Sequence, residues 1–301
     1  MSSNLGQALA SAASRLAGLD APEAQAEELL GRLLGLGRSE LYLQRGRELS
    51  SDQWRRLEAW LERRLRGEPL QYITGRAAFR GLDLAVDRSV LIPRPETEGL
   101  VEAVLGVLRS EQGGWPHPRV LDLGTGSGAI ALSIASEWPT ARVVATDVAP
   151  EALDLARANA ARLGLAERVR FVRSDWFDAI DADQRFEAVV SNPPYVATGE
   201  WDLLEHQVRA FEPSRALFSG PTGLEALREI ADLAPAHLVA RGLMALELAE
   251  MRAGQVEAWL EGARDWEYVK VLDDLAGRPR VLLARRQGGP AIAPAQWGEE
   301  G

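Results

Sequence analysis

The sequence has no cysteine among its 301 residues, which excludes disulfide bonds, a thiolate nucleophile and a zinc site built from cysteine. A chain without cysteine suits a reducing compartment, so we expect this protein in the cytoplasm. Histidine is scarce as well, and its three copies, His117, His206 and His237, form no H-x-x-x-H pair. We therefore predict that the protein holds no metal ion.

Long apolar segments are missing too. No run approaches the roughly 20 residues that a membrane-spanning helix needs, and the N-terminus lacks the basic-then-apolar order of a secretory signal. Lysine occurs once, at Lys270, so arginine supplies nearly all of the positive charge. The net charge is −10, and residues 1–74 contribute none of it because they carry 10 acidic and 10 basic side chains. Such a balance would repel nucleic acid, so we expect neither a membrane nor a nucleic acid as a direct partner.

The first part of the chain, residues 1–74, has apolar residues at helical spacing. Pro22 is placed to open one of its helices, because proline is favoured at the first helical position. Ser50 and Gln53 have the spacing of a capping box ahead of another helix. We predict a small all-helical N-terminal domain, and the pattern leaves open whether it is a folded cap or a partner-binding domain.

Three further segments follow. Short alternating stretches around Gly81 predict a hairpin connector over residues 75–92. Residues 93–287 are expected to form a larger domain, and residues 288–301, rich in glycine and proline, are expected to be a disordered tail.

Strand and helix patterns alternate through the larger domain, which predicts an α/β fold with a mostly parallel sheet and helices on both faces. The last two strands follow each other closely, so we expect them to form an antiparallel hairpin at one edge of the sheet. Seven strands are expected, in the segments "RVLDLG", "RVVATDV", "RVRFVRSD", "FEAVVSN", "GLMALELA", "EYVKVLDD" and "RVLLARR".

The stretch "VLDLGTGSGAIAL" places Gly124, Gly126 and Gly128 between the first strand of this series and a helix. Glycines there let the chain turn tightly and let a ligand approach the backbone. The loop has no lysine, so it is not a P-loop, and Thr125 stands where a nucleophile elbow with Ser127 would need glycine. The pattern alone is compatible with a dinucleotide site, a nucleoside site or a tight turn.

Asp147 ends the next strand, 19 residues after Gly128, where a carboxylate can accept hydrogen bonds from an adenosine ribose. That position serves NAD and S-adenosylmethionine (SAM) sites alike, and an aspartate there can instead cap a helix. Trp176, next to Asp175 at the end of the third strand, can stack on adenine or pack in the core. Asp122, inside the first strand, is a less obvious partner for the amine of a bound methionine.

A fourth strand ends in "VVSNPPYVA", and the carboxyl edge of a parallel sheet is where such folds bind ligands. Pro193 and Pro194 fix their φ angles and carry no N–H, so their carbonyls are acceptors in defined directions. Asn192 adds a side-chain acceptor, and Tyr195 offers a ring face for stacking or for a cation. Such a corner can hold an NH₂ group with an acceptor for each N–H, which would favour displacement by its nitrogen on the methyl of SAM.

The segments "LDLGTGSGAIALSIA" and "VVSNPPYV" resemble those of the class I SAM-dependent N-methyltransferases, which have a Rossmann-like fold. The further segments "VLIPRPETE", "SDWF" and "FEP" are similar to the protein-(glutamine-N5) methyltransferases, and most of all to the release factor glutamine methyltransferase (HemK/PrmC) family. The resemblance covers nearly the whole chain, and it implies that residues 93–287 are the methyltransferase domain.

The resemblance implies a reaction and a set of residues. The methyl of SAM would go to the side-chain amide N5 of the glutamine in the Gly-Gly-Gln motif of peptide chain release factors, with the helical domain helping to dock that protein. Separately from the resemblance, we expect the enzyme to be a monomer. The cofactor-binding residues would be Gly124, Thr125, Gly126, Ser127, Gly128, Asp147, Trp176 and Asn192. The substrate-binding residues would be Asn192, Pro193, Pro194 and Tyr195, and among these Asn192, Pro193 and Tyr195 would be catalytic.

Some features carry less weight. Arg94, Glu96 and Glu98 are candidates for the rim near the methionine end, or for a charged helix start, and Glu212 of "FEP" has no assigned role. The segment "LELAEM" departs from the Glu-His-Gly sequence expected there, which weakens any role argued for that loop.

Three alternatives remain at this point. A methyltransferase for a ribosomal-protein glutamine would share the same pocket. A DNA N6-adenine methyltransferase would need base flipping and a basic surface, which the net charge disfavours. A non-catalytic NAD-binding or SAM-sensing module would have no need for paired acceptors at an open position.

Overall fold

The computed structural model describes residues 4–110 and 114–288. Its residues divide into two compact units: one holds the chain up to Arg76 together with Glu205–Phe211, and the other holds Ala77–Leu204 and the chain from Glu212 onward. Except for Gly288, the tail that we predicted to be disordered lies outside the described residues.

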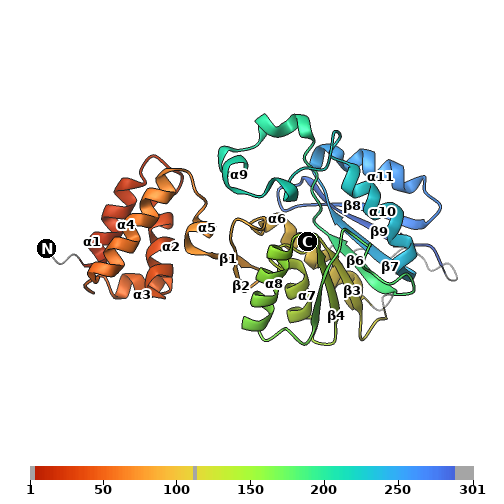
Figure 1. Ribbon diagram of the computed structural model, residues 1–301, viewed down its shortest axis with the longest axis horizontal. Helices are drawn as coiled ribbons and strands as arrows, with labels where there is room; N and C mark the ends of the chain where they lie inside the picture. The colour runs from red at the N-terminus through yellow and green to blue at the C-terminus, as the bar shows by residue number, and fades with distance from the viewer. Residues whose placement is uncertain (1–3, 111–113, 289–301) are drawn as a thin grey trace. The chain divides into compact units, whose positions relative to one another are not determined.

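The first unit is all-helical (Figure 1), and its core consists of leucine and alanine side chains from its longer helices. Ser50 and Gln53 form the predicted capping box, since Ser50 Oγ accepts from Gln53 N at 3.2 Å and Gln53 Oε1 accepts from Ser50 N at 2.9 Å. Pro22 opens its helix as expected. The helices of this unit are α1 (Leu5–Arg15), α2 (Pro22–Leu34), α3 (Arg38–Leu43), α4 (Ser51–Leu65), α5 (Leu70–Thr74) and α9 (His206–Phe211).

Helix α9 was not expected in this unit from the sequence, because it comes about 130 residues later in the chain than the other helices. The buried guanidinium of Arg64 connects the helices: its Nε donates to Gln25 Oε1 at 2.6 Å, and its Nη1 donates to Gln207 Oε1 at 3.2 Å. Gly67 lies so close to His206 that a Cβ there would be 3.4 Å from His206 Nδ1. Non-local hydrogen bonding and close packing therefore hold α9 in the helical unit.

Apart from Arg76, the two-stranded sheet of β1 (Arg76–Phe79) and β2 (Leu82–Ala85) belongs to the second unit. Both residues of the connecting turn, Arg80 and Gly81, have positive φ angles of 45° and 75°. Such angles at both central positions are typical of a tight hairpin turn. The strands that the sequence predicted around Gly81 are thus present.

A seven-stranded sheet forms the centre of the second unit, with the order β5-β4-β3-β6-β7-β9-β8. The first five strands of this order are parallel to one another, while β9 is antiparallel to β7 and to β8. The predicted mostly parallel sheet with an antiparallel hairpin at its edge is confirmed. The strands are β3 (Arg119–Leu123), β4 (Arg142–Asp147), β5 (Val169–Arg173), β6 (Phe186–Ser191), β7 (Leu238–Glu247), β8 (Trp266–Asp273) and β9 (Pro279–Arg286).

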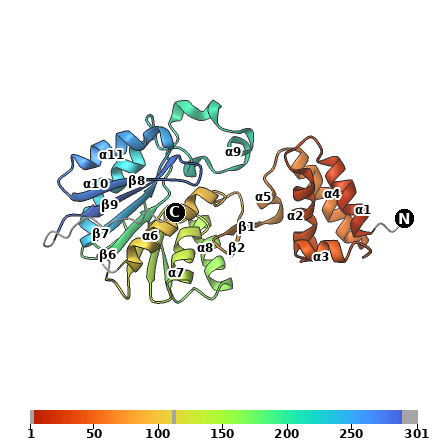
Figure 2. The same cartoon turned by 180° about the vertical axis from the view of Figure 1, so that it is seen from behind.

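Helices cover both faces of this sheet, as Figures 1 and 2 show from opposite sides. Successive strand residues enter different cores because side chains alternate across a strand: Val120 joins one core, and Leu121 joins the other. Full burial of a leucine or valine contributes about 1.5–3 kcal/mol, so both faces stabilise the unit. The first face packs against α6 (Pro95–Arg109), α7 (Ala129–Glu137) and α8 (Pro150–Arg162), and the second packs against α10 (Glu225–His237) and α11 (Ala253–Glu261).

Three short 3₁₀ helices complete the second unit: η1 (Thr198–Leu203), η2 (Ser214–Ala216) and η3 (Glu250–Arg252). Within the described parts of the chain, no helix is both long enough and apolar enough to cross a membrane. The same residues contain no group of three or more acidic or histidine side chains suited to hold a metal ion.

Candidate functional site

Three parallel strands end side by side at one edge of the sheet. In the register of β3 with its neighbours, Leu123 lies opposite Thr146 of β4 and opposite Ser191 of β6. The residues that follow these positions are Gly124, Asp147 and Asn192, so the register alone brings them together. This is the edge at which doubly wound folds bind their ligands.

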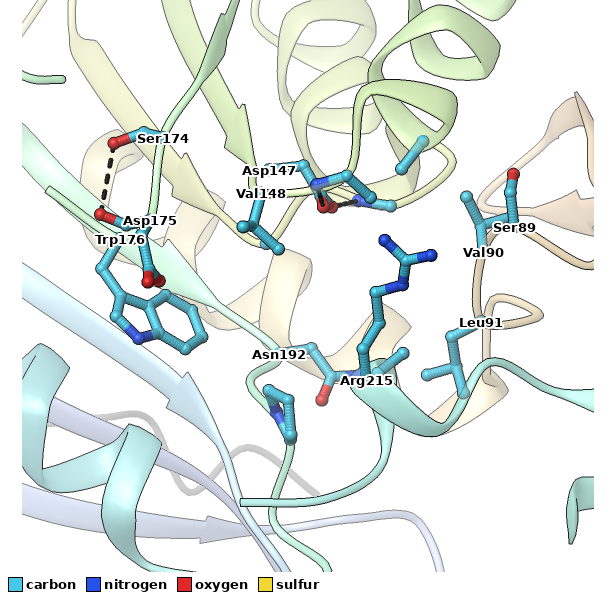
Figure 3. Close-up of a pocket in the computed structure, with 16 residues that line it drawn as sticks. Ser89, Val90, Leu91, Asp147, Val148, Ser174, Asp175, Trp176, Asn192 and Arg215 are labelled. Carbon is cyan, nitrogen blue, oxygen red and sulfur yellow. Dashed lines mark hydrogen bonds between the residues drawn. The ribbon is translucent and has the colours of Figure 1, made fainter. Parts of the chain in front are cut away.

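A cavity of about 130 Å³ lies at this edge (Figure 3). In the figure Trp176 and Asp175 lie on one side, the segment from Ser89 to Leu91 lies on the other, and Asn192 and Asp147 lie on opposite sides of the space between them. The lining residues that the sequence singled out are Gly124, Gly126, Asp147, Asp175, Trp176, Asn192 and Pro194.

The glycine loop depends on a backbone that other residues rarely adopt. Gly124, Gly126 and Gly128 have φ angles of 69°, 55° and 86°. At Gly128, which caps α7, a Cβ would approach Leu132 Cδ1 to 2.9 Å. At Gly124 a Cβ would stand 3.7 Å from the Trp176 ring, between the loop and the indole, so glycine here keeps the cavity open.

Asp122 is fully buried beneath this loop. Its Oδ2 accepts from Thr125 Oγ1 at 2.6 Å and from Ala131 N at 3.2 Å, so the carboxylate joins the loop to the first turn of α7. Its Oδ1 has no hydrogen-bond partner among the described residues. Burial raises the pKa of Asp122 to about 7, partly offset by these two hydrogen bonds. In this structure Asp122 stabilises the loop, and its side chain does not line the cavity.

The raised pKa of Asp122 predicts how stability depends on pH. In the unfolded chain the group titrates near 4, so between about pH 4 and 7 the folded protein binds a proton that the unfolded chain does not. This group therefore makes the free energy of unfolding fall as pH rises through that range. Asn at this position keeps an acceptor for Thr125 and cannot ionise. We expect Asp122→Asn to lose less stability than the wild type between about pH 5 and pH 8, measured by urea unfolding. Parallel slopes for the two proteins would show that Asp122 titrates normally.

Asp147 holds the glycine loop from the neighbouring strand. Its Oδ2 accepts from Gly126 N and its Oδ1 from Ala149 N, each at 2.9 Å. Burial raises its pKa, and these backbone N–H groups lower it in part. Helix α8 is capped at Ala149 without a side-chain hydrogen bond, so Asp147 is not its N-cap residue, although it braces the turn before it. The carboxylate remains half-buried at the cavity wall.

Of the two roles that its position suggested, Trp176 shows core packing in this structure, and its ring is also placed at the cavity. The core against which it packs also contains Phe177. Its φ angle of 38° is unusual for a residue other than glycine. Surrounding packing must hold this backbone conformation, and it turns the indole toward the glycine loop.

The Asn-Pro-Pro-Tyr corner is anchored by the residue before it, because Ser191 Oγ donates to the carbonyl of Leu123 at 2.7 Å. Asn192 and Pro194 line the cavity, whereas Pro193 is buried and Tyr195 lies outside the lining. Burial, together with nearby Glu247, raises the pKa of the Tyr195 phenol to about 12, so it stays protonated at neutral pH.

Three other residues expected in the cofactor site also lie outside the cavity lining. Thr125 is occupied by Asp122, and Gly128 begins α7. The carbonyl of Ser127 accepts from the buried Asn159 side chain at 2.9 Å. Their contacts in this structure shape the loop from behind.

Some residues of the site were not predicted. Arg215 of η2 extends toward Asp147 in Figure 3, and its charge lowers the pKa of that carboxylate. Val90 and Leu91 line the opposite wall. Nothing in the local pattern distinguishes Arg215 from an ordinary loop residue, whereas Val90 and Leu91 begin the quoted segment "VLIPRPETE" without having been assigned a role. Thr97 and Glu247 were not predicted as site residues either, although Thr97 lies in the segment "VLIPRPETE" and Glu247 lies in the segment "LELAEM". In the structure Thr97 hydrogen-bonds to both Asn192 and Glu247.

The candidate rim residues make ion pairs and hydrogen bonds within the protein. Arg94 Nη2 lies 2.6 Å from Oε1 of Glu212, whose side chain is almost completely buried, so the arginine of "LIPRPETE" pairs with the glutamate of "FEP". Glu98 accepts from the backbone N–H of Arg80 at 3.0 Å and thereby ties α6 to the hairpin turn.

Comparison with known proteins identifies the family. Residues 7–75 match the PrmC N-terminal domain, and residues 103–215 match the methyltransferase small domain. A release factor glutamine methyltransferase of Koribacter versatilis is 43% identical over 284 residues, covering 94% of this chain and 98% of that protein. The chain belongs to the release factor glutamine methyltransferase family.

Other matches agree with this assignment. The release factor glutamine methyltransferase of Chlorobaculum tepidum is 44% identical, covering 89% of this chain and 92% of that protein. A solved methyltransferase structure from Pyrococcus furiosus is 20% identical, with a TM-score of 0.51 and coverage of 79% of this chain and 100% of that one, which supports the fold. The resemblance drawn from the motifs is confirmed, and the chain is a methyltransferase of this family.

Within this family assignment, the expected Glu-His-Gly segment reads Glu247-Leu248-Ala249 here. Leu248 is fully buried in the core beside α10 and α11, so this chain uses the second position for packing. Glu247 is buried too, and it contacts the Asn192 corner through Thr97.

Proposed function

We propose that this protein transfers a methyl group from SAM to the side-chain amide N5 of the glutamine in the Gly-Gly-Gln motif of peptide chain release factors. Similarity to release factor glutamine methyltransferases over 94% and 89% of the chain supports the substrate class. The observation that carries the chemistry is that the glycine loop, Asp147 and Asn192 meet at one cavity. A methyl donor and an amide can therefore be held side by side.

The residues around the cavity suit an adenosine-containing methyl donor. Positive φ angles and missing Cβ atoms at Gly124 and Gly126 leave the backbone open to a ligand. We assign Asp147 to the ribose hydroxyls and Trp176 to the adenine, with Val148 and Ala149 adding apolar surface. Thr125, Ser127 and Gly128 would support the loop that binds the ligand.

SAM supplies an electrophilic methyl on a sulfonium: the new C–N bond forms as the C–S electron pair returns to sulfur, and the amide nitrogen gives up one proton to solvent. This chain has to orient a weakly nucleophilic amide. In our proposal Asn192 Oδ1 and the Pro193 carbonyl each accept one N–H of the glutamine. Positive charge develops on that nitrogen as the bond forms, so both hydrogen bonds strengthen in the transition state. Pro194 stiffens the corner, and Tyr195 packs beside it as a neutral phenol.

The alternative functions receive less support. A ribosomal-protein glutamine methyltransferase would use the same corner, but the relatives matched over most of the chain are named for release factors. A DNA adenine methyltransferase is disfavoured by the net charge of −10. A cofactor sensor without transfer would not explain why Asn192 keeps an acceptor at the cavity.

We assign the helical unit to docking of the release factor. The unit is separate and compact, with its own core, as a substrate-recognition domain would be. Its boundary is proposed near Gly75, where the family domain also ends, with α9 as an added element. Such a partner belongs to translation, so the enzyme is proposed to work in the cytoplasm.

The test is transfer of labelled methyl from SAM to purified substrates, followed by mass spectrometry to locate the label. A release factor should be labelled at its Gly-Gly-Gln glutamine, and the same factor with that glutamine replaced by alanine should not. Ribosomal protein and duplex DNA serve as competing substrates. Preferential labelling of either one, or of another residue in the release factor, would refute the proposal.

A further inference from the structure

A chain of three side chains lies behind the Asn192 corner. Asn192 Nδ2 is 3.1 Å from Thr97 Oγ1, and Thr97 Oγ1 is 2.6 Å from Glu247 Oε2. Thr97 is in the first turn of α6 and Glu247 ends β7, so the three residues come from separate elements of the second unit. Thr97 is 4% exposed and Glu247 is 1% exposed, which keeps competing water away.

The direction of these hydrogen bonds follows from chemistry. An ionised carboxylate can only accept, so the hydroxyl proton of Thr97 points to Glu247. Thr97 Oγ1 then offers lone pairs to its other neighbour, and only the NH₂ end of Asn192 can use them. Among the described residues nothing donates to Asn192 Oδ1, which is left for a ligand in the cavity.

We propose that Thr97 and Glu247 are positioning residues that set which end of the Asn192 carboxamide faces the substrate. The inference rests on the proposed function, because an amide substrate needs an acceptor from Asn192. Reversal of the carboxamide would present NH₂ to the NH₂ of the glutamine, a repulsive arrangement with no hydrogen bond. Thr97 and Glu247 touch neither the reacting nitrogen nor the methyl donor in this assignment.

The placement of Glu247 is hard to explain by packing alone. A buried carboxylate is costly unless it has partners, and Glu247 is 1% exposed at the end of a core strand. The Glu247 carboxylate accepts a hydrogen bond from Thr97, whose other side-chain partner is the cavity residue Asn192. We therefore connect the unfavourable burial of the Glu247 carboxylate with the orientation of the Asn192 side chain.

The hydrogen-bonded chain from Glu247 through Thr97 to Asn192, which we call the relay, also predicts how the rate of methyl transfer depends on pH. Burial raises the pKa of Glu247 to about 7, and the groups facing it are Arg280 from β9, Arg94 and Glu96 at the start of α6, and the Tyr195 phenol. Arg280 and Arg94 favour the ionised form, and Glu96 opposes it. Protonated Glu247 can donate to Thr97, which frees the threonine hydroxyl to donate to Asn192 Oδ1 and reverse the carboxamide. The maximal rate should therefore rise with pH through about 7.

Thr97→Val removes the hydroxyl and keeps the shape, and Thr97→Ser restores the hydroxyl. We expect the valine variant to lose about 10- to 100-fold in kcat, as with other residues that orient a functional group, with the affinity for SAM changed little. The serine variant should recover most of that loss. Thr140→Val is the matched control, because Thr140 hydrogen-bonds to the Pro116 carbonyl and the Trp138 indole at the opposite end of β4. It should transfer methyl at the wild-type rate.

Glu247→Gln gives an independent readout. Glutamine cannot ionise, so the rise in kcat through about pH 7 should disappear in Glu247→Gln. The same rise should be absent in Thr97→Val and present in Thr97→Ser. A valine variant with wild-type kcat, or an unchanged pH profile in Glu247→Gln, would overturn the relay. Failure of the wild type to methylate any release factor would instead remove the proposed function, so the two ideas fail separately.

Discussion

Replacing Asn192 by alanine should lower methyl transfer on the order of 10²- to 10³-fold, which is the loss typical when one preorganised hydrogen-bonding group is removed from a reacting centre. The reason is geometric: Asn192 lines the cavity at the end of β6, and its Oδ1 is available while Nδ2 is bound to Thr97. Single-turnover transfer to a release factor at saturating SAM measures the effect on the chemical step directly.

A second variant, Asn192→Asp, distinguishes the contribution of the acceptor oxygen from the contribution of side-chain shape. Asn192→Asp keeps an acceptor oxygen at the same place, so it should retain more activity than the alanine variant. SAM affinity, measured by calorimetry, should change only modestly in both variants. An alanine variant whose SAM affinity falls as far as its rate would assign Asn192 to the cofactor and would contradict its substrate role.

Replacing Asp147 by alanine should raise the SAM concentration needed for half-maximal transfer by about 10- to 100-fold. Hydrogen bonds to a charged group contribute roughly 1.5–3 kcal/mol, and that free energy corresponds to the stated range of affinity. The carboxylate also holds Gly126 and Ala149 through their N–H groups, so part of the loss would come from a loosened loop.

Asp147→Asn distinguishes these contributions. It keeps one acceptor oxygen, and its NH₂ cannot accept from Gly126 N or from a ribose hydroxyl. We expect an intermediate affinity for SAM in this variant, with kcat at saturating SAM close to that of the wild type. An unchanged SAM requirement in both variants is incompatible with the assignment of Asp147 to the ribose.

The parts of the fold that the sequence predicted are those set by local pattern. Strand segments such as Val143–Ala145 carry β-branched and apolar residues continuously because both faces are buried, and helices follow at regular intervals. The capping box at Ser50 depends only on residues three positions apart. Helix α9 escaped prediction because six residues give a weak helical pattern and its partner Arg64 is 143 positions away from Gln207.

In the site, too, residues placed by local pattern were predicted, and residues placed by contacts distant in sequence were not. Gly124, Asp147 and Asn192 were recognisable because each follows a strand, and parallel strands end at one edge. The relay could not be derived in this way, since Thr97 and Glu247 are 150 positions apart and each looks ordinary in its own segment. Thr97 reads as a residue in a helix start, and Glu247 as the polar end of a strand. Their relation exists only after α6 packs beside β7.

The central claim is that a rigid corner at the end of β6 presents acceptors to a glutamine carboxamide beside the methyl donor. A crystal structure of the enzyme with S-adenosylhomocysteine and a release factor tests this most directly. We predict that the glutamine nitrogen lies within about 2.7–3.2 Å of both Asn192 Oδ1 and the Pro193 carbonyl, and points to the sulfur. A bound glutamine that meets neither oxygen, or a corner turned away from the sulfur, would contradict the mechanism.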